Sequence, residues 1–440
     1  MSWRLGPNDF KPASWDGYGE DWPLSYEDLA PYYARVERYV GVSGERAGLK
    51  QIPDGEFQPA MAMNRGERYF KETIERNVGR PVIMGRTAIL TQAHRGRSAC
   101  HYCGPCEQGC VTHSYFSSLW TTLVDAAKSG NCEIRTDAVV SHVTADRATG
   151  RANGVAYIDR LTRQAREARG KVVVLCGSTI ESVRMLLNSG EGFCNSSGTL
   201  GRYVMDHIAG AASGVIPVKE DRKWVGAPRR PNGIYLPRMS NVERPHTNGV
   251  IRGYGIQGSH GSSYGSPGSI ARIPGFGRAF KEEVHRRDDW WRMGLTAYAE
   301  CLPSYDNRVS LDPDVRDAWG VPAARIQVRW GANELKLYET MLDECEELLR
   351  VAGAKTTTRQ AEPRWPGGAT HELGGARMGA DPRKSVVGRY RQTHDVKNLF
   401  VADGSVFPSS PCQNPTLTMM AMALETAEWI VDRAKRGELG

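Results

Sequence analysis

Short apolar runs followed by helical periodicity occur twice in the chain, near residue 175 and near residue 400. In the first, residues 172–175 are apolar, Gly177 follows, and Leu and Met then recur at helical spacing as far as Gly190. In the second, residues 399–402 are apolar, and the run after the loop presents one apolar face: Leu417, Met420, Ala421, Leu424 and Ala427. Each pattern predicts a strand, a turn and a helix. The continuous apolar run at 399–402 is typical of a parallel strand that is covered on both faces.

Other segments carry clear start and stop signals. Ser25 with Asp28 three residues later predicts the beginning of a helix, which Gly41 or Gly44 should end. Residues 45–66 read as loop, residues 114–131 as a helix that runs to about Lys128, and residues 132–146 and 152–162 as a pair of strands.

The pattern changes between residues 206 and 365, where short strand-like runs alternate with Gly/Ser-rich connections at 249–269 and with one helix at 334–349. We therefore predict an α/β (α+β) fold in which an antiparallel-sheet domain interrupts an α/β domain. The predicted units are residues 1–205, 206–365 and 366–440. The second should shape a substrate pocket. Trp224, Trp290, Trp291 and Tyr298 are candidates for a ring that stacks there, and a place in the core is the alternative for each.

Composition excludes several classes of protein. The 440 residues are 40% hydrophobic and 24% charged, as expected of a globular chain. The apolar runs are too short to span a bilayer. The net charge of +7 comes from 57 basic residues dispersed among 50 acidic ones, without the dense basic block of a nucleic-acid binder. The first ten residues lack a signal-peptide pattern. A cytoplasmic location fits the chain as written, and a periplasmic one would need a signal upstream of Met1.

Four of the ten cysteines, Cys100, Cys103, Cys106 and Cys110, lie within eleven residues. Their C-x2-C-x2-C-x3-C spacing matches a ferredoxin run, except that Val111 replaces the usual proline. Three interpretations stay open: an iron–sulfur cluster, a zinc site, or no metal with a disulfide or free thiols. His101 and His113 are candidate substitute ligands, although bystander roles suit them better.

The loop between the last predicted strand and the last predicted helix has chemistry of its own. Asp403 and Gly404 follow the strand, at the edge where open α/β sheets bind ligands. Asn414 is a good N-cap, Pro415 suits the first helical position, and Thr416 begins the helix. The free N–H groups of such a helix favour an electron-rich ring edge that gains negative charge. The competing interpretation is a capped core helix after a buried strand.

Four stretches follow one another along the chain: DWPLSYEDLAPYYARVE, KVVVLCGSTIESVRMLLNSG, HELGGARMG and NLFVADGSVFPSSPCQNPTLTMMAMA. Together they resemble the glucose–methanol–choline (GMC) family of flavin oxidoreductases, in its bacterial sugar and gluconate dehydrogenase or pyranose-oxidase-like branch. The resemblance implies an FAD-binding Rossmann-like domain and two catalytic residues, His371 and Asn414. His371 would accept the hydroxyl proton of an alcohol, and Asn414 would hydrogen-bond the same oxygen.

The resemblance also implies cofactor contacts. Asp403 and Gly404 would lie near the ribityl and pyrophosphate groups of FAD, and Gly177 near the adenosine half. Asn414, Pro415 and Thr416 would lie against the flavin. His207 fits the family pattern as well, where we expect it to order the domain junction.

One expected feature is missing. The family begins with a G-x-G-x-x-G turn, and the one match here, residues 253–258, precedes a Gly/Ser-rich stretch that cannot open a helix. By resemblance, residues 2–10 correspond to a point inside the family's first flavin-binding segment. The α/β domain should then be incomplete at its N-terminal side. Three explanations fit: Met1 is a mispredicted start, the chain is one half of a split gene product, or the chain is a degraded remnant. We expect the chain alone to bind FAD poorly, and a complementing FAD-binding chain is one predicted partner.

The predicted function is oxidation of a CH–OH group of a sugar or polyol by FAD, with His371 as general base. If the four cysteines bind an iron–sulfur cluster, the electron acceptor should be a protein. If they do not, the acceptor should be oxygen or a quinone. Two alternatives stand: a non-catalytic fragment or subunit that needs a separate FAD-binding chain, and an electron-transfer module on the four cysteines. The sequence leaves open the substrate, the choice between oxidase and dehydrogenase, and the oligomeric state.

Overall fold

The two largest hydrophobic clusters in the described residues form the cores of the molecule. One packs against an antiparallel sheet, and the other surrounds a small parallel sheet. The computed structural model describes residues 1–104, 106–146, 148–216, 232–246, 249–262, 271–288 and 291–439. The helices are α1 Pro12–Asp16, α2 Tyr26–Val40, α3 Arg65–Val78, α4 Thr122–Lys128, α5 Thr179–Leu187, α7 Gly277–Asp288, α8 Ala332–Val351 and α9 Thr416–Lys435, with short 3-10 turns η1 Pro7–Phe10, η2 Cys106–Gln108, η3 Ser118–Trp120 and η5 Gly404–Val406. The strands are β1 Ile83–Met84, β2 Ala138–Asp146, β3 Arg151–Asp159, β4 Ala165–Arg169, β5 Val173–Leu175, β6 Ile208–Ile216, β7 Ile234–Leu236, β8 Tyr254–Ser262, β9 Trp291–Ala299, β10 Arg308–Arg316, β11 Pro322–Gln327, β12 Thr357–Arg359 and β13 Leu399–Val401.

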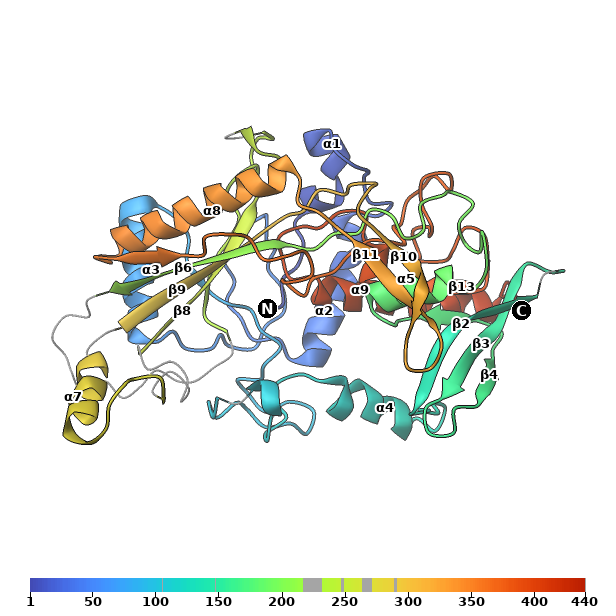
Figure 1. Cartoon of the computed structure of the whole chain (residues 1–440), viewed down its shortest axis with the longest axis horizontal. Helices are drawn as coiled ribbons and strands as arrows, with labels where there is room; N and C mark the ends of the chain where they lie inside the picture. The colour runs from blue at the N-terminus through green and yellow to red at the C-terminus, as the bar shows by residue number, and fades with distance from the viewer. Residues whose placement is uncertain are drawn as a thin grey trace.

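The larger sheet is antiparallel, with the strand order β1-β7-β8-β9-β6-β12 in the described residues. Helix α8 lies along β6 and β9 in Figure 1 and buries Leu337, Met341 and Cys345 against them. Gly210 of β6 permits this close approach, because a Cβ there would lie 2.6 Å from the Tyr338 ring. The sheet has the antiparallel character that we predicted for residues 206–365, and all its strands except β1 fall in that range. The division of the chain at those bounds stays a prediction.

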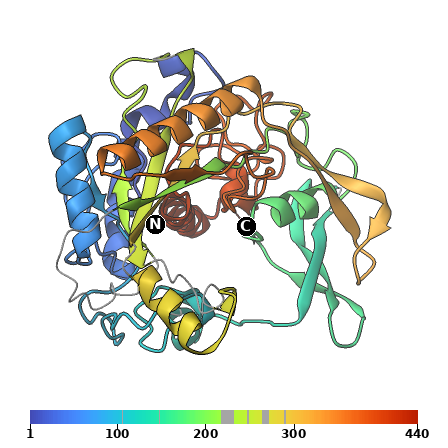
Figure 2. The ribbon, with the colours of Figure 1, turned by 60° about the vertical axis from the view of Figure 1, so that its left-hand side comes forward.

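The smaller sheet pairs β5 with β13 in parallel, Val173 opposite Leu399 and Leu175 opposite Val401. Helix α5 follows β5, and α9 follows β13 after the loop, so both predicted strand–turn–helix units are present. In Figure 2, α9 lies near the centre of the molecule, with the sheet of β2, β3 and β4 to its right. The prediction of cover on both faces is right for β13, whose residues are fully buried. It does not extend to β5, where the Val174 side chain is 43% exposed.

Local signals located most element ends. Helix α2 begins after the Ser25–Asp28 capping box and ends at Gly41 in the left-handed conformation, as predicted. The predicted helix at 114–131 is wrong in its first half, because Ser117 caps the separate 3-10 turn η3 and α4 covers Thr122–Lys128 alone. The predicted strand pair is β2 with β3, and β4 extends it.

The isolated glycine-rich match at 253–258 lies at the start of β8 and so forms no phosphate-binding turn. Its Gly255 lies against the Tyr235 side chain, where a Cβ would come within 2.1 Å of the hydroxyl oxygen. In the described part of the chain, no helix combines the length and the apolar character that crossing a membrane requires.

Candidate active site

Three distant segments bring His371, Asn414 and His207 into one hydrogen-bonded group. The Nδ2 atom of Asn414 lies 2.9 Å from His371 Nε2, and His207 Nδ1 lies 2.9 Å from His371 Nδ1. His207 is fully buried at the start of the segment that leads into β6, whereas His371 and Asn414 are half-buried. The two residues that we predicted to be catalytic are therefore in direct contact.

A buried carboxylate shapes the turn that carries His371. The two oxygens of Asp206 accept hydrogen bonds from the backbone N–H groups of Gly367, Ala369 and His371, at 2.9 to 3.0 Å. Three N–H donors on one carboxylate hold the turn closely to the start of β6. Gly374, three residues later, has φ of +81°, and a Cβ there would lie 2.1 Å from the Tyr203 carbonyl oxygen. The turn thus needs glycine at this position.

Asn414 has a different local role from the one expected. It does not cap α9: Pro415 occupies the N-cap position, with no side-chain cap, and the helix begins at Thr416. The predictions that Asn414 is the N-cap and that Pro415 is the first helical residue are wrong. Instead the Asn414 side chain turns away from the helix. Its Nδ2 faces His371, and its Oδ1 accepts a hydrogen bond of 3.1 Å from Gln257 Nε2.

Burial determines the charge state of the histidine pair. Burial first, then the neighbouring His207 and the N-terminal ammonium group, lower the pKa of His371 to about 2. Burial likewise lowers the pKa of His207. Both imidazoles are therefore neutral near pH 7, and a neutral imidazole has one nitrogen free to accept a proton.

Aromatic side chains border this group. The Tyr298 ring of β9 lies 5.7 Å from the His371 ring between centroids. Of the rings proposed to stack on a sugar, Tyr298 is therefore close to the predicted base. Trp224 and Trp290 lie outside the described residues, and so does the side chain of Trp291.

Three of the predicted cofactor residues, Gly177, Asp403 and Gly404, lie at the carboxyl ends of β5 and β13. The Ser182 hydroxyl accepts from the Gly177 N–H at 2.9 Å and donates to Asp403, whose other oxygen accepts from the Ser405 N–H and hydroxyl. Gly404 lies where a Cβ would be 2.6 Å from the Thr179 hydroxyl oxygen. These contacts give Asp403 and both glycines a packing role, and their contact with a cofactor stays a prediction.

Both helices that follow the parallel strands begin without a side-chain cap, α5 after Ser178 and α9 after Pro415. The N–H groups of an uncapped first turn are available to a ligand. A hollow of about 940 Å³ adjoins the first turn of α9. It is lined by Thr416, Met420, Ala423 and Leu424 of α9, by Arg35, Val36, Arg38 and Tyr39 of α2, and by His94, Arg95, Phe116, Ser118 and Thr122.

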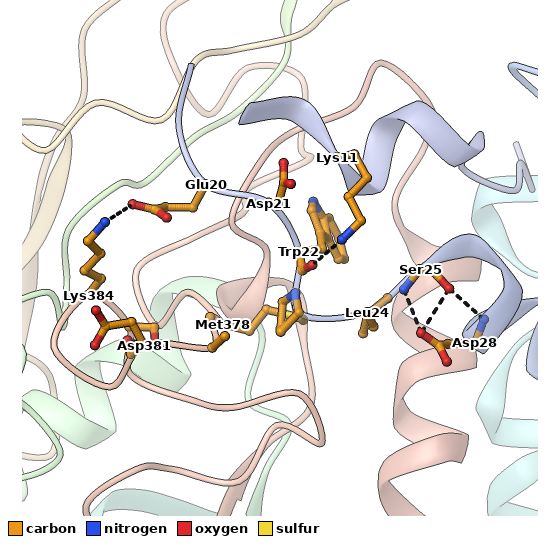
Figure 3. Close-up of a pocket in the computed structure, with 14 residues that line it drawn as sticks. Lys11, Glu20, Asp21, Trp22, Leu24, Ser25, Asp28, Met378, Asp381 and Lys384 are labelled. Carbon is orange, nitrogen blue, oxygen red and sulfur yellow. Dashed lines mark hydrogen bonds and ion pairs between the residues drawn. The ribbon is translucent and has the colours of Figure 1, made fainter. Parts of the chain in front are cut away.

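A second hollow, of about 500 Å³, is lined by residues between positions 11 and 28 and between 378 and 385, and none of them is a predicted site residue (Figure 3). Its charged groups are already engaged. Lys384 pairs with Glu20 at 3.1 Å, Lys11 donates to the Trp22 carbonyl oxygen, and Asp28 accepts from Ser25. It therefore offers no reacting group.

The four clustered cysteines do not form a preformed metal site. All are free thiols, Cys103 is exposed, and no group of three potential metal ligands occurs in the described residues. Burial, and then the neighbouring thiols of Cys100, Cys103 and Cys110, raise the pKa of Cys106. His113 stacks on Trp120, with 4.6 Å between ring centroids.

Sequence reasoning missed Gln257 and Asp206. Gln257 lies on β8 and Asp206 directly before β6, so no pattern near Asn414 or His371 points to either. The acidic residue beside His207 was the one available signal for the turn.

Comparison with known proteins identifies the family of the chain. Sequence models of the GMC oxidoreductase family match residues 84–209, the N-terminal family domain, and residues 303–423, the C-terminal one. The 2-methyl-1,2-propanediol dehydrogenase of Mycolicibacterium austroafricanum is 31% identical over 98% of this chain and 78% of its own length. The chain belongs to the GMC oxidoreductase family. It is a flavoprotein of the class that uses FAD to oxidise CH–OH groups, as the resemblance implied.

Other GMC relatives are similar over nearly the whole chain. The fructose dehydrogenase large subunit of Gluconobacter japonicus is 29% identical over 99% of this chain and 79% of its own length. Paromamine 6'-oxidase of Streptomyces fradiae is 29% identical over 97% of this chain and 75% of its own length.

Solved structures support the GMC fold. Formate oxidase of Aspergillus oryzae superimposes with a TM-score of 0.62 at 15% identity, over 100% of this chain and 83% of that one. Pyridoxine 4-oxidase of Mesorbium loti gives a TM-score of 0.58 at 16% identity, over 98% of this chain and 81% of that one. The predicted fold class is confirmed.

Proposed function

We propose that this GMC oxidoreductase oxidises a CH–OH group of a sugar or polyol, with His371 as general base and Asn414 as the partner that holds the same oxygen. FAD, when bound, supplies the acceptor for the hydride at its N5 atom. The observation that carries the proposal is the 2.9 Å contact between His371 Nε2 and Asn414 Nδ2.

The residues suit the two jobs. In the structure Asn414 Nδ2 donates to the Nε2 lone pair of His371 at 2.9 Å, so the alcohol has to displace this contact. Its oxygen can then give its proton to His371 Nε2 and accept a hydrogen bond from Asn414 Nδ2. The amide stabilises negative charge on that oxygen without competing for the proton, because it has no accessible basic nitrogen. With the pKa of His371 lowered to about 2, the base is unprotonated at every ordinary working pH.

The chain offers matching contacts for FAD. The uncapped start of α9 and the hollow beside Thr416 provide N–H donors and an apolar wall close to Asn414. We propose that Asn414, Pro415 and Thr416 lie against the flavin. Asp403, Gly404 and Gly177, at the carboxyl ends of β13 and β5, would lie along the rest of the cofactor.

The reaction is tested by anaerobic mixing of the FAD-loaded protein with a panel of sugars and polyols. We expect loss of the visible flavin band with at least one of them, because the flavin accepts the hydride. Simple monoalcohols serve as the comparison. If dithionite bleaches the flavin but none of the sugars or polyols does, the proposed substrate class is refuted.

We further propose that the chain holds FAD weakly unless a complementing FAD-binding segment or chain is present. The exposed face of β5 at Val174, on a parallel sheet of two strands in the described residues, supports this. Purified alone with added FAD and then desalted, the protein should keep little visible flavin absorbance. Co-expression with a complementing FAD-binding chain should raise the occupancy. Full occupancy of the chain alone would contradict both this proposal and the alternative of a non-catalytic subunit.

An iron–sulfur cluster on Cys100, Cys103, Cys106 and Cys110 is a secondary proposal that rests on their spacing. The thiols as arranged do not fit one, so the segment would have to rearrange around it, and no step of the reaction is assigned to it. With a cluster, we propose an electron-acceptor protein as partner, and without one, oxygen or a quinone. Iron and acid-labile sulfide in anaerobically prepared protein distinguish these cases.

A further inference from the structure

A continuous chain of hydrogen bonds runs through the candidate active site. His207 Nε2 lies 2.7 Å from the Pro411 carbonyl oxygen, and its other nitrogen lies 2.9 Å from His371 Nδ1. His371 Nε2 then lies 2.9 Å from Asn414 Nδ2, and Asn414 Oδ1 accepts from Gln257 Nε2. The hydrogen-bond chain thus begins at Pro411 and comes back to the same loop, between β13 and α9, at Asn414.

The two ends of this chain determine where each proton lies. A carbonyl oxygen can only accept, so His207 Nε2 must carry a hydrogen and donate to Pro411. A neutral His207 then has a lone pair on Nδ1, which obliges His371 to donate from its own Nδ1. His371 Nε2 is left with a lone pair, which the Asn414 amide approaches with an N–H. Every bond in the chain has one donor and one acceptor in this arrangement.

The alternative proton positions fail at a specific contact. A doubly protonated His207 would turn His371 Nδ1 into an acceptor and place the hydrogen of His371 on Nε2. That hydrogen would then face the Asn414 N–H group, two donors 2.9 Å apart. To relieve this contact the Asn414 amide would have to turn round together with the Gln257 amide, because Gln257 Nε2 donates to Asn414 Oδ1. The buried setting of His207 also disfavours its charged form.

We infer that His207 is a positioning residue that fixes the proton of His371 on Nδ1, so that Nε2 keeps a lone pair for a substrate hydroxyl that displaces the Asn414 contact. The inference rests on the proposed function for its catalytic meaning. Its structural content, the tautomer of His371, is separate. His207 would act through His371 and touch neither substrate nor flavin.

Two substitutions separate this role from simple packing. The amide of His207→Asn reaches the place of the imidazole Nδ1, so its oxygen can still accept from His371. The amide of His207→Gln reaches the place of Nε2, so it can still donate to Pro411 but leaves His371 Nδ1 without an acceptor. We expect His207→Gln to lower the rate of flavin reduction about 10- to 100-fold, as loss of an outer partner of a functional histidine does, and His207→Asn to stay close to the parent. Equal losses in both variants, or a larger loss in His207→Asn, would overturn the inference.

The tautomer itself is measured by nitrogen NMR of protein labelled in its histidines, with His371→Ala to assign the signal. The experiment uses the chain as purified, without added FAD, and so does not depend on turnover. We expect a protonated Nδ1 and an unprotonated Nε2 for His371 in the parent and in His207→Asn, and a mixture in His207→Gln. A protonated Nε2 in the parent would overturn the inference. If His371 has the expected tautomer but no sugar or polyol reduces the flavin, the inference about His207 stands and the proposed function is refuted.

Discussion

Replacing His371 by alanine should lower the rate of flavin reduction by the alcohol substrate by about 10²- to 10⁴-fold, the usual contribution of a positioned general base. The imidazole Nε2 is the basic atom that Asn414 Nδ2 faces at 2.9 Å. Without it the hydroxyl proton has no acceptor when the hydride leaves. Stopped-flow reduction of the FAD-loaded protein at saturating substrate isolates this step from reoxidation.

His142→Ala is a matched control, because it removes another half-buried histidine, on β2, that is bonded to Ser141 rather than to the site. It should reduce its flavin at the parental rate. The pH profile gives a second criterion. Because the pKa of His371 is lowered to about 2, the parent should show no loss of reduction rate between pH 8 and pH 5 from protonation of this residue. A His371→Ala variant within threefold of the parent would remove His371 from the proposed mechanism.

The sequence was sufficient for the features that depend on neighbours along the chain. The capping box at Ser25, the left-handed Gly41 and the two strand–turn–helix units are local, and the structure has all of them. The pairing of His371 with Asn414 is not local. It came from the resemblance to the GMC family, since nothing in the spacing of two residues 43 positions apart requires their side chains to meet.

Features that depend on distant parts of the chain escaped prediction. Asn414 looked like an N-cap because the residue types around it favour one, but a hydrogen bond to His371 and one from Gln257, 157 positions away, hold the side chain elsewhere. The exposure of Val174 escaped for the same reason. An apolar run shows that a strand is compatible with burial, while the neighbours that would bury it are set by the whole fold.

A buried ionic network supports the loop that carries Asn414. The guanidinium of Arg238 pairs with Asp9 at 2.9 Å and with Glu300. The second oxygen of Asp9 accepts from the Gln413 side chain at 3.0 Å, and Gln413 directly precedes Asn414. All four side chains are at least nine-tenths buried. The network therefore joins η1, the segment after β7, the residue that follows β9 and the loop that carries Asn414.

Arg238→Met should lower the free energy of unfolding by about 3–5 kcal/mol, the cost of removing one partner from a buried ion pair. The substitution leaves Asp9 and Glu300 buried without the cation that pairs with both. The loss of this pairing would also loosen the loop around Gln413, whose side chain donates to Asp9. Chemical denaturation followed by tryptophan fluorescence measures the change, and an unchanged midpoint would show that solvent reaches the network.

Glu300→Gln is the matched control, because it leaves Arg238 with one carboxylate and keeps a side-chain oxygen to accept from it. Its stability near pH 7 should equal or exceed that of the parent. Burial raises the pKa of Glu300 to about 7, above its ordinary value of 4.5. Arg238 lowers this pKa and Asp9 raises it, but burial has the largest effect. A raised folded-state pKa means that the folded protein binds this proton more tightly than the unfolded chain does. The stabilisation is complete below pH 4.5 and is lost as the pH rises towards 7. The parent should therefore lose stability over this interval relative to Glu300→Gln, and parallel profiles of the two proteins would show that Glu300 stays ionised in the folded state.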